Sequence, residues 1–185
     1  RLACQTRLRG PVDVIVPTDV LAAESFPCRV VSNRMMAPLI RELVFELPEG
    51  RDFAFRAGGF AQLTAPAYEL DFATVEVEPQ HEQAWRIAGW PGLRAVSTAP
   101  VTRAYSIANR PEDAGSIVFN IRLAVPPAGR EADVAPGVVS SWLFALKPGD
   151  TVEVGGPFGE FHVQPTDREM VFIGGGVGMA PLRSM

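Results

Sequence analysis

Arg103-Ala104-Tyr105-Ser106 is the first of three short motifs that decide the expected fold. The second is Gly137-Val138-Val139-Ser140, and the third is Gly174-Gly175-Gly176-Val177-Gly178-Met179-Ala180-Pro181. The first motif joins a cation, a phenol and a small hydroxyl, and the other two are glycine turns that can expose backbone N–H groups to phosphate. Each motif alone is a weak signal. In this order and spacing they predict one task, the binding of two dinucleotides side by side.

The segments around these motifs alternate between apolar and polar residues, which indicates short antiparallel strands. Strands are expected at residues 28–32, 40–47, 60–64, 103–108, 116–125 and 151–154. One short helix is expected at residues 140–146, ended by Pro148 and Gly149. The sequence therefore predicts a mainly β fold, a six-stranded antiparallel Greek-key barrel with one short helix.

Both ends of the sequence look cut, and four regions are expected. Residues 1–16 have the pattern of a domain tail, residues 17–26 of a linker, residues 27–165 of the barrel domain and residues 166–185 of the start of a truncated α/β domain. Residues 170–173 are apolar throughout, which predicts a parallel strand buried on both faces. Such a strand needs sheet neighbours and a crossover helix, so we expect an internal piece of a larger protein.

One stretch, residues 66–101, breaks the strand rhythm. It carries Pro66, Pro79, Pro91 and Pro100 together with Trp85 and Trp90, and it is expected to be irregular. A loop this long inside a compact domain is usually functional or ordered by packing.

The composition excludes several classes of protein. Apolar residues make up 47% and charged residues 21% of the chain, which is ordinary for a soluble globular protein. The net charge of -4 argues against a nucleic-acid partner, because phosphate binding needs a basic face. No stretch approaches the roughly 20 apolar residues of a membrane-spanning helix. No signal peptide is expected, and Cys4 and Cys28 are too few for a disulfide framework.

The first motif suits a flavin. On a strand, Arg103 and Tyr105 share one face and Ser106 turns to the other. An arginine fork can clamp a pyrophosphate, and a tyrosine ring one step along can stack on the flavin ring. Ser106 would then hydrogen-bond near the nitrogen that accepts hydride. The alternative is a half-exposed edge strand that contains these residues by chance.

The two glycine motifs suit phosphates. Gly137 leads into a helix, whose free N–H groups and positive dipole end make an anion site. The alternative is a helix simply capped by Ser140 or Ser141. The run from Gly174 follows an expected buried strand and precedes a helix-compatible stretch, which is the context of the dinucleotide-binding fingerprint. A tight structural turn is the alternative there.

With these motifs together, the chain resembles the ferredoxin–NADP reductase superfamily, in which an R-x-Y-S strand and a G-x-x-S helix start bind the flavin. Gly156-Pro157-Phe158-Gly159 is similar to the G-P-x-G turn of that superfamily. Within it, the chain resembles the F subunits of sodium-translocating NADH:quinone reductases. The similarity includes the insert at 66–101 and covers the stretches 1–5, 55–60, 103–109, 120–124 and 170–184.

The resemblance implies a set of site residues. Tyr105 and Ser106 would act at the reactive part of the flavin. The other residues implied to bind FAD are Arg103, Ala104, Ala108, Asn109, Arg122, Ala124, Gly137, Val138, Val139 and Ser140. Those implied at the NADH pyrophosphate are Gly174, Gly175, Gly176, Gly178 and Pro181.

Cys4 lies in Leu2-Ala3-Cys4-Gln5, which is similar to the fourth ligand position of a plant-type 2Fe–2S domain. The resemblance implies that residues 1–16 are the remnant of such a ferredoxin domain. Cys4 would be a cluster ligand in the parent protein, where the other ligands lie upstream. Cys28 is expected in the core, and His162 at a solvated position.

The resemblance also implies a function. Hydride would pass from NADH to FAD, and electrons would leave through a 2Fe–2S cluster toward quinone in the membrane subunits of a sodium-pumping complex. The complex would sit in the bacterial inner membrane with this soluble piece on the cytoplasmic face. Two alternatives stay open: a reductase component of an aromatic-ring oxygenase, and a flavin-free interaction module.

Overall fold

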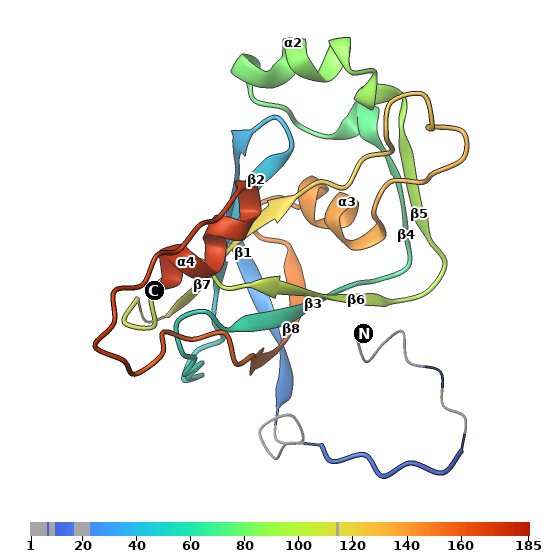
Figure 1. Ribbon diagram of the computed structural model, residues 1–185. Helices are drawn as coiled ribbons and strands as arrows, with labels where there is room; N and C mark the ends of the chain where they lie inside the picture. Colours follow the sequence, from blue (N-terminus) through green and yellow to red (C-terminus); the bar gives the residue numbers. More distant parts are fainter. Residues whose placement is uncertain (1–6, 8–9, 17–22, 114) are drawn as a thin grey trace.

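A curved antiparallel sheet of six strands dominates the computed structural model, which describes residues 7, 10–16, 23–113 and 115–185 (Figure 1). The order of the strands in the sheet is β6-β3-β8-β1-β2-β7. The bounds are β1 Glu24–Ala37, β2 Ile40–Glu46, β3 Phe60–Ala65, β6 Val101–Ser106, β7 Ser116–Arg122 and β8 Thr151–Phe158. All six expected strands are present, which confirms the mainly β fold.

The two edge strands, β6 and β7, approach each other where the sheet curls. Ile107, just after β6, forms an isolated bridge with Phe119 of β7. The N–H of Ala108 donates to the carbonyl of Val118 at 2.8 Å. Among the described residues, the sheet is therefore a half-barrel whose edges join at this corner alone, and the rest of β6 has no strand partner on its outer side.

The core lies inside the curl. The alternation that predicted the strands places Leu43 and Phe45 of β2 inward, and both are fully buried. Phe45 packs edge-on against Phe119 with 5.6 Å between ring centroids. Burial of such side chains is the main favourable term in folding.

The insert at 66–101 is ordered, so the expectation of an irregular stretch was wrong. It contains a separate two-stranded sheet and the helix α2. Pro79 is the first residue of α2, a position where its missing N–H costs nothing. The strands are only four residues long, too short to give a clear alternation. The elements are β4 Tyr68–Asp71, η2 Phe72–Thr74, α2 Pro79–Ile87, η3 Trp90–Gly92 and β5 Arg94–Ser97.

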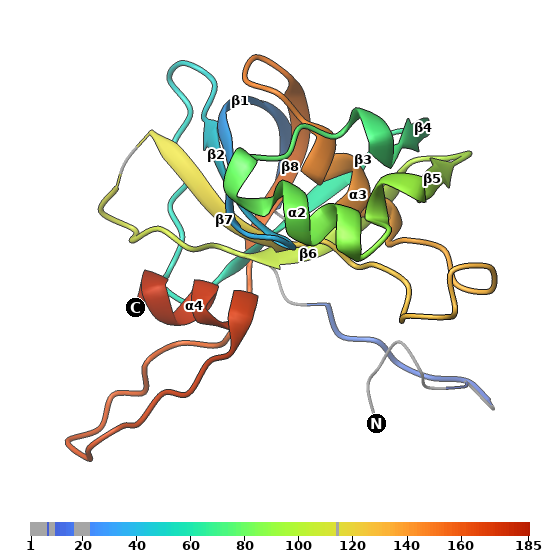
Figure 2. The ribbon, with the colours of Figure 1, turned by 90° about the horizontal axis from the view of Figure 1, so that it is seen from above.

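Two more helices follow. The expected short helix is α3, Val138–Ala145, which lies between the sheet and the insert (Figure 1). A turn η4 at Gly176–Gly178 leads into α4, Met179–Ser184. Figure 2 shows the segment between β8 and α4 extending away from the sheet. Among the described residues, no helix has the length and apolar character needed to cross a bilayer.

The buried parallel strand expected at 170–173 is not formed. Val171 is 79% exposed and Ile173 is 92% exposed. A strand of that kind needs paired strands on both sides and helices over both faces, and no described segment pairs with it. At the other end, β1 begins at Glu24, within the expected linker. Residues 17–22 of that linker, and Cys4, lie outside the described residues.

Candidate functional site

A hollow of about 360 Å³ lies where β6, the end of β7 and the start of α3 meet. Every residue that lines it is among those predicted from the sequence to bind a flavin. They are Arg103, Ala104, Tyr105, Arg122, Ala124, Gly137, Val138, Val139 and Ser140. The fold thus brings together the first two motifs, which lie on β6 and at the start of α3 and are separated by about 30 positions in the sequence.

Two hydrogen bonds tie the start of α3 to Ala124, just after β7, and a third lies within the helix start. The N–H of Gly137 donates to the Ala124 carbonyl at 2.8 Å, and the N–H of Ala124 donates to Ser140 Oγ at 3.2 Å. Ser140 Oγ in turn donates to the Gly137 carbonyl at 3.1 Å. A Cβ on Gly137 would lie 2.8 Å from the Cβ of Ala124, so this close approach requires glycine.

The N-cap residue of α3 is Gly137, with no side-chain cap. The alternative of a serine cap is therefore not found. The first N–H groups of an α-helix lack partners within the helix and carry partial positive charge. In α3 these groups belong to residues that line the hollow, which gives the hollow an anion-binding end.

Two guanidinium groups add to the positive charge. Arg103 and Arg122 are both exposed and stand on β6 and β7. Arg103 Nη1 donates to the Thr102 carbonyl at 2.8 Å. In the described part of the chain, neither guanidinium pairs with a carboxylate. Both can therefore turn toward an anion in the hollow.

Tyr105 supplies the aromatic surface. Its side chain is half-buried, and burial raises its pKa from 10.0 to about 12. Arg103 acts in the opposite direction and Tyr68 in the same direction as burial. The raised pKa favours the neutral phenol. The face of its ring can stack against another flat ring. Ser106 is half-buried at the end of β6 and does not line the hollow.

Ala108 and Asn109 lie elsewhere and have structural contacts. Ala108 is fully buried against Val118 and Ala180. Asn109 Oδ1 accepts from the Val118 N–H at 2.9 Å, and its Nδ2 donates to the Ser116 carbonyl at 3.1 Å. These contacts join β6 to β7, and they keep both side chains out of the hollow.

The glycine run is likewise separate from the hollow. The helix α4 that follows it packs Ala180 against the β6–β7 corner. Ser184 Oγ donates to the Asn109 carbonyl at 2.7 Å, and Arg183 pairs with Glu42 of β2 at 2.5 Å. None of Gly174, Gly175, Gly176, Gly178 and Pro181 lines the hollow.

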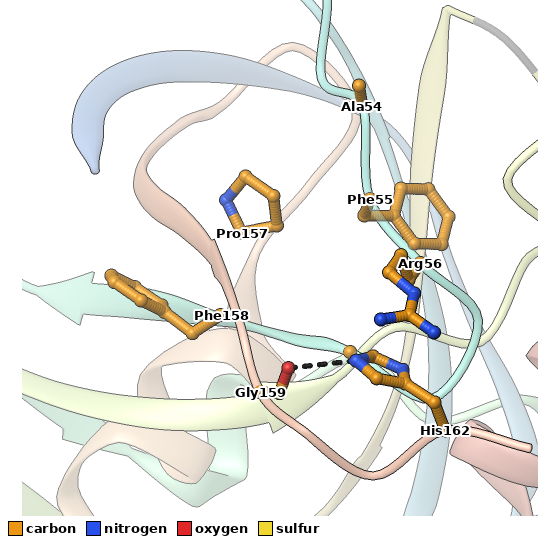
Figure 3. A pocket seen from close by; sticks show the side chains of 8 residues that line it. Ala54, Phe55, Arg56, Pro157, Phe158, Gly159 and His162 are labelled. Atoms are coloured by element: carbon orange, nitrogen blue, oxygen red, sulfur yellow. Dashed lines mark hydrogen bonds between the residues drawn. The ribbon is translucent and has the colours of Figure 1, made fainter. Parts of the chain in front are cut away.

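A second, smaller hollow of about 180 Å³ lies at the G-P-x-G turn (Figure 3). His162 borders it, with Nδ1 at 2.8 Å from the Ala57 carbonyl and Nε2 at 3.0 Å from the Gly159 carbonyl. The expectation of a solvated histidine was therefore wrong, since the ring bridges two loops. Gly58 adopts a φ of +88°, and a Cβ there would lie 1.8 Å from the Phe161 carbonyl oxygen.

Three residues around α3 were missed from the sequence. Tyr68 of β4 donates from its hydroxyl to the Val138 carbonyl at 2.5 Å. Arg41 of β2 is 4% exposed, lies 5.1 Å from the ring centroid of Phe144, and has a pKa lowered mainly by burial. Trp85 Nε1 donates to the Pro38 carbonyl at 2.7 Å. Arg41 carried a readable signal, because a charge at an inward position of an alternating strand demands buried partners.

Metal ligation has little support in the described residues. They contain no group of three or more His, Cys, Asp or Glu side chains arranged to hold a metal ion. Cys28 is fully buried in the core, as expected, and burial and then Glu153 raise its pKa to about 12. Cys4 lies outside the described residues, so its role as a cluster ligand stays a prediction.

Comparisons with known proteins agree with the prediction that the hollow is a flavin site. Residues 91–163 match the family described as oxidoreductase FAD-binding domain. The chain is 47% identical over 184 residues to the F subunit of the Na(+)-translocating NADH-quinone reductase of Methylococcus capsulatus, covering all of this chain and 45% of that protein. The corresponding F subunit of a Marinomonas species is 46% identical over 185 residues, with the same coverage of each chain.

Among solved structures, the phthalate dioxygenase reductase superposes with a TM-score of 0.56 and 20% sequence identity, over 86% of this chain and 38% of that one. This likeness shows a shared fold. The chain spans less than half the length of the curated relatives it matches. By these matches, the chain is similar over its full length to part of the F subunits of Na(+)-translocating NADH-quinone reductases, and residues 91–163 match an oxidoreductase FAD-binding domain.

Proposed function

We propose that this chain holds FAD in the hollow between β6, β7 and α3, and that it serves NADH:quinone oxidoreduction in its parent protein. The observation that carries the proposal is the meeting of two guanidiniums, one phenol and the N-terminus of α3 around a single hollow. A FAD-binding family match over the same part of the chain supports it.

The residues of the hollow fit the parts of FAD. Arg103, Arg122 and the first N–H groups of α3 suit the diphosphate, since charge-assisted hydrogen bonds to phosphate are about twice as strong as neutral ones. Gly137 has no Cβ, which lets the helix start lie close against Ala124 at the edge of the hollow. Tyr105 suits the flat ring, and Ser106 at the end of β6 would hydrogen-bond at its reactive edge.

Bound FAD supplies hydride acceptance and one-electron release. The chain itself has only to bind and orient the flavin, so no general base is assigned. Burial raises the pKa of Tyr105 and so favours its neutral phenol.

For the parent protein we propose the wider route implied by its relatives. Gly174, Gly175, Gly176, Gly178 and Pro181 would contact the NADH pyrophosphate, and Cys4 would ligate a 2Fe–2S cluster. Ala108 and Asn109 would act by holding the corner that joins the flavin hollow to this glycine run. Electrons would continue to quinone through membrane subunits of a sodium-translocating complex, with this part of the chain on the cytoplasmic face.

A reductase component of an aromatic-ring oxygenase is the second candidate, and the shared fold with phthalate dioxygenase reductase favours it. The insert distinguishes the two. The insert is part of the resemblance to the F subunits. Its ordered elements and its contact with α3 therefore support the NADH:quinone reductase function, whereas an insert without structure would have favoured the oxygenase reductase.

A titration of the purified chain with FAD tests the proposal. We expect saturable binding with a shifted visible flavin spectrum, and reduction of the bound flavin by NADH in the full-length protein. A colourless chain that takes up no added FAD would leave the flavin-free interaction module as the better interpretation.

A further inference from the structure

The insert contacts the helix start at one polar point. The hydroxyl of Tyr68 donates to the Val138 carbonyl at 2.5 Å, and Tyr68 does not itself line the hollow. Burial raises the pKa of Tyr68, while the neighbouring Ser141 hydroxyl and Trp142 N–H lower it. Tyr68 thus contacts the first turn of α3 without itself lining the hollow.

This contact bears on the N–H group of Val139, a residue that lines the hollow. The peptide unit between Val138 and Val139 is planar and trans, so its carbonyl and its N–H point in opposite directions. A hydrogen bond that holds the carbonyl of Val138 back therefore aims the N–H of Val139 forward. The preceding unit is held in the same way, since the Gly137 carbonyl accepts from the Ser141 N–H at 2.9 Å.

The other end of α3 is held by separate contacts. Asn33 Nδ2 donates to the carbonyls of Leu143 and Leu146 at 3.0 and 2.7 Å. The rings of Trp85 and Phe144 stack at 6.3 Å between centroids with 20° between their planes. The helix therefore keeps its place without Tyr68, and the phenol hydroxyl acts mainly on the first peptide units.

We propose that Tyr68 is a positioning residue of the flavin site, one that aims the backbone N–H groups of α3 at the diphosphate. The inference rests on the proposed function, because it presumes that FAD occupies the hollow. It assigns to the insert an indirect part in cofactor binding, made through the hydroxyl of Tyr68 and the carbonyl of Val138.

The test compares Tyr68→Phe with wild type in titrations with FAD and with riboflavin, which lacks phosphate. The variant removes only the hydroxyl. A lost neutral hydrogen bond predicts that the dissociation constant for FAD rises about threefold to tenfold. The constant for riboflavin should stay within about twofold, since a positioning effect on the diphosphate does not reach the ring.

Thr74→Val is the matched control. Thr74 is exposed in the same insert, and its Oγ1 donates to the Asp71 carbonyl at 2.7 Å, which is also a hydroxyl-to-carbonyl bond. We expect its FAD affinity to equal that of wild type. Urea titrations of the ligand-free proteins check that each variant is folded under the conditions of binding.

The outcomes separate the two proposals. Unchanged FAD affinity in Tyr68→Phe, with tight binding by wild type, overturns the inference and leaves the proposed function intact. Equal losses for FAD and riboflavin also overturn it, because they mean a general loss of structure. Absence of FAD binding by wild type overturns the proposed function, and the inference with it.

Discussion

Sequence motifs predict phosphate binding in two regions, the hollow at the start of α3 and the glycine run at 174–178, and the structure holds these regions differently. In the first region, strands of the sheet and the start of α3 are held together by hydrogen bonds, such as that from the Gly137 N–H to the Ala124 carbonyl. The second follows a segment with no strand partner among the described residues.

The difference teaches what a motif needs. Arg103 and Tyr105 belong to a strand paired along its length with β3, so their direction is set by the sheet. Gly174 to Gly178 depend on a segment whose residues Val171 and Ile173 are exposed. In the dinucleotide-binding fold the glycine turn follows a strand of the sheet, which fixes the position of the turn. The hollow therefore provides the better-defined site.

The largest expected effect is that of Arg103→Ala on FAD affinity. Loss of a charge-assisted contact with phosphate costs about 1.5–3 kcal/mol, which is about 10-fold to 150-fold in the dissociation constant. Calorimetric titration measures it. Arg168→Ala, an exposed arginine before the glycine run, is the control and should leave the affinity for FAD unchanged. Equal losses of FAD affinity in the two variants would contradict the assignment of the flavin to the hollow rather than to the region of the glycine run.

Gly137→Ala should come next. The added Cβ would lie 2.7 Å from Ser140 Oγ and 2.8 Å from the Ala124 Cβ, so the helix start must shift. We expect a loss of about 1–3 kcal/mol of stability in urea and a weaker affinity for FAD. Gly175→Ala is the matched control, because nothing lies within 4 Å of a Cβ there. Normal FAD binding by Gly137→Ala would contradict the close approach.

Alkaline pH tests the core of the sheet, to which Cys28 of β1 belongs. Cys28 has a pKa raised from 9.0 to about 12, so its thiol stabilises the fold below pH 9. As pH rises from 9 toward 12, the unfolded chain ionises first and stability falls, by at most about 1.4 kcal/mol per pH unit for this group. Urea midpoints of wild type and Cys28→Ala measure this, and the variant should show the shallower decline. Parallel declines would contradict the assignment.

The smallest expected effect is that of Arg183→Ala, which removes the ion pair to Glu42 that helps to dock α4. The arginine is largely exposed, so the loss of stability should be no more than about 1 kcal/mol. FAD affinity should not change, because the pair lies outside the hollow. A fall in FAD affinity would mean that the two regions are coupled.

Much of the fold follows from local pattern. The strands were predictable because their side chains alternate between core and solvent, as in Leu43 and Phe45. The residue types of Arg103 and Tyr105 suit phosphate and a flat ring, and the rest of the lining was predicted from the family resemblance. The Gly137 turn was predictable because only glycine allows its approach to Ala124.

The rest depends on contacts between distant segments. Tyr68 meets Val138 across 70 positions, and nothing near Tyr68 in the sequence marks that bond. Asn109 was assigned to the cofactor by the family resemblance, and its contacts with Ser116 and Val118 at the β6–β7 corner could not be read from the sequence. The apolar run at 170–173 has the composition of a buried strand, but a strand exists only with a partner.

Backbone amide chemical shifts, recorded while FAD is added to the chain without NADH, test the central claim most directly. We predict large changes at Val138, Val139 and Arg103, and none at Gly174 to Gly178. Large changes at the glycine run with none at the start of α3 would contradict the assignment of the flavin to the hollow.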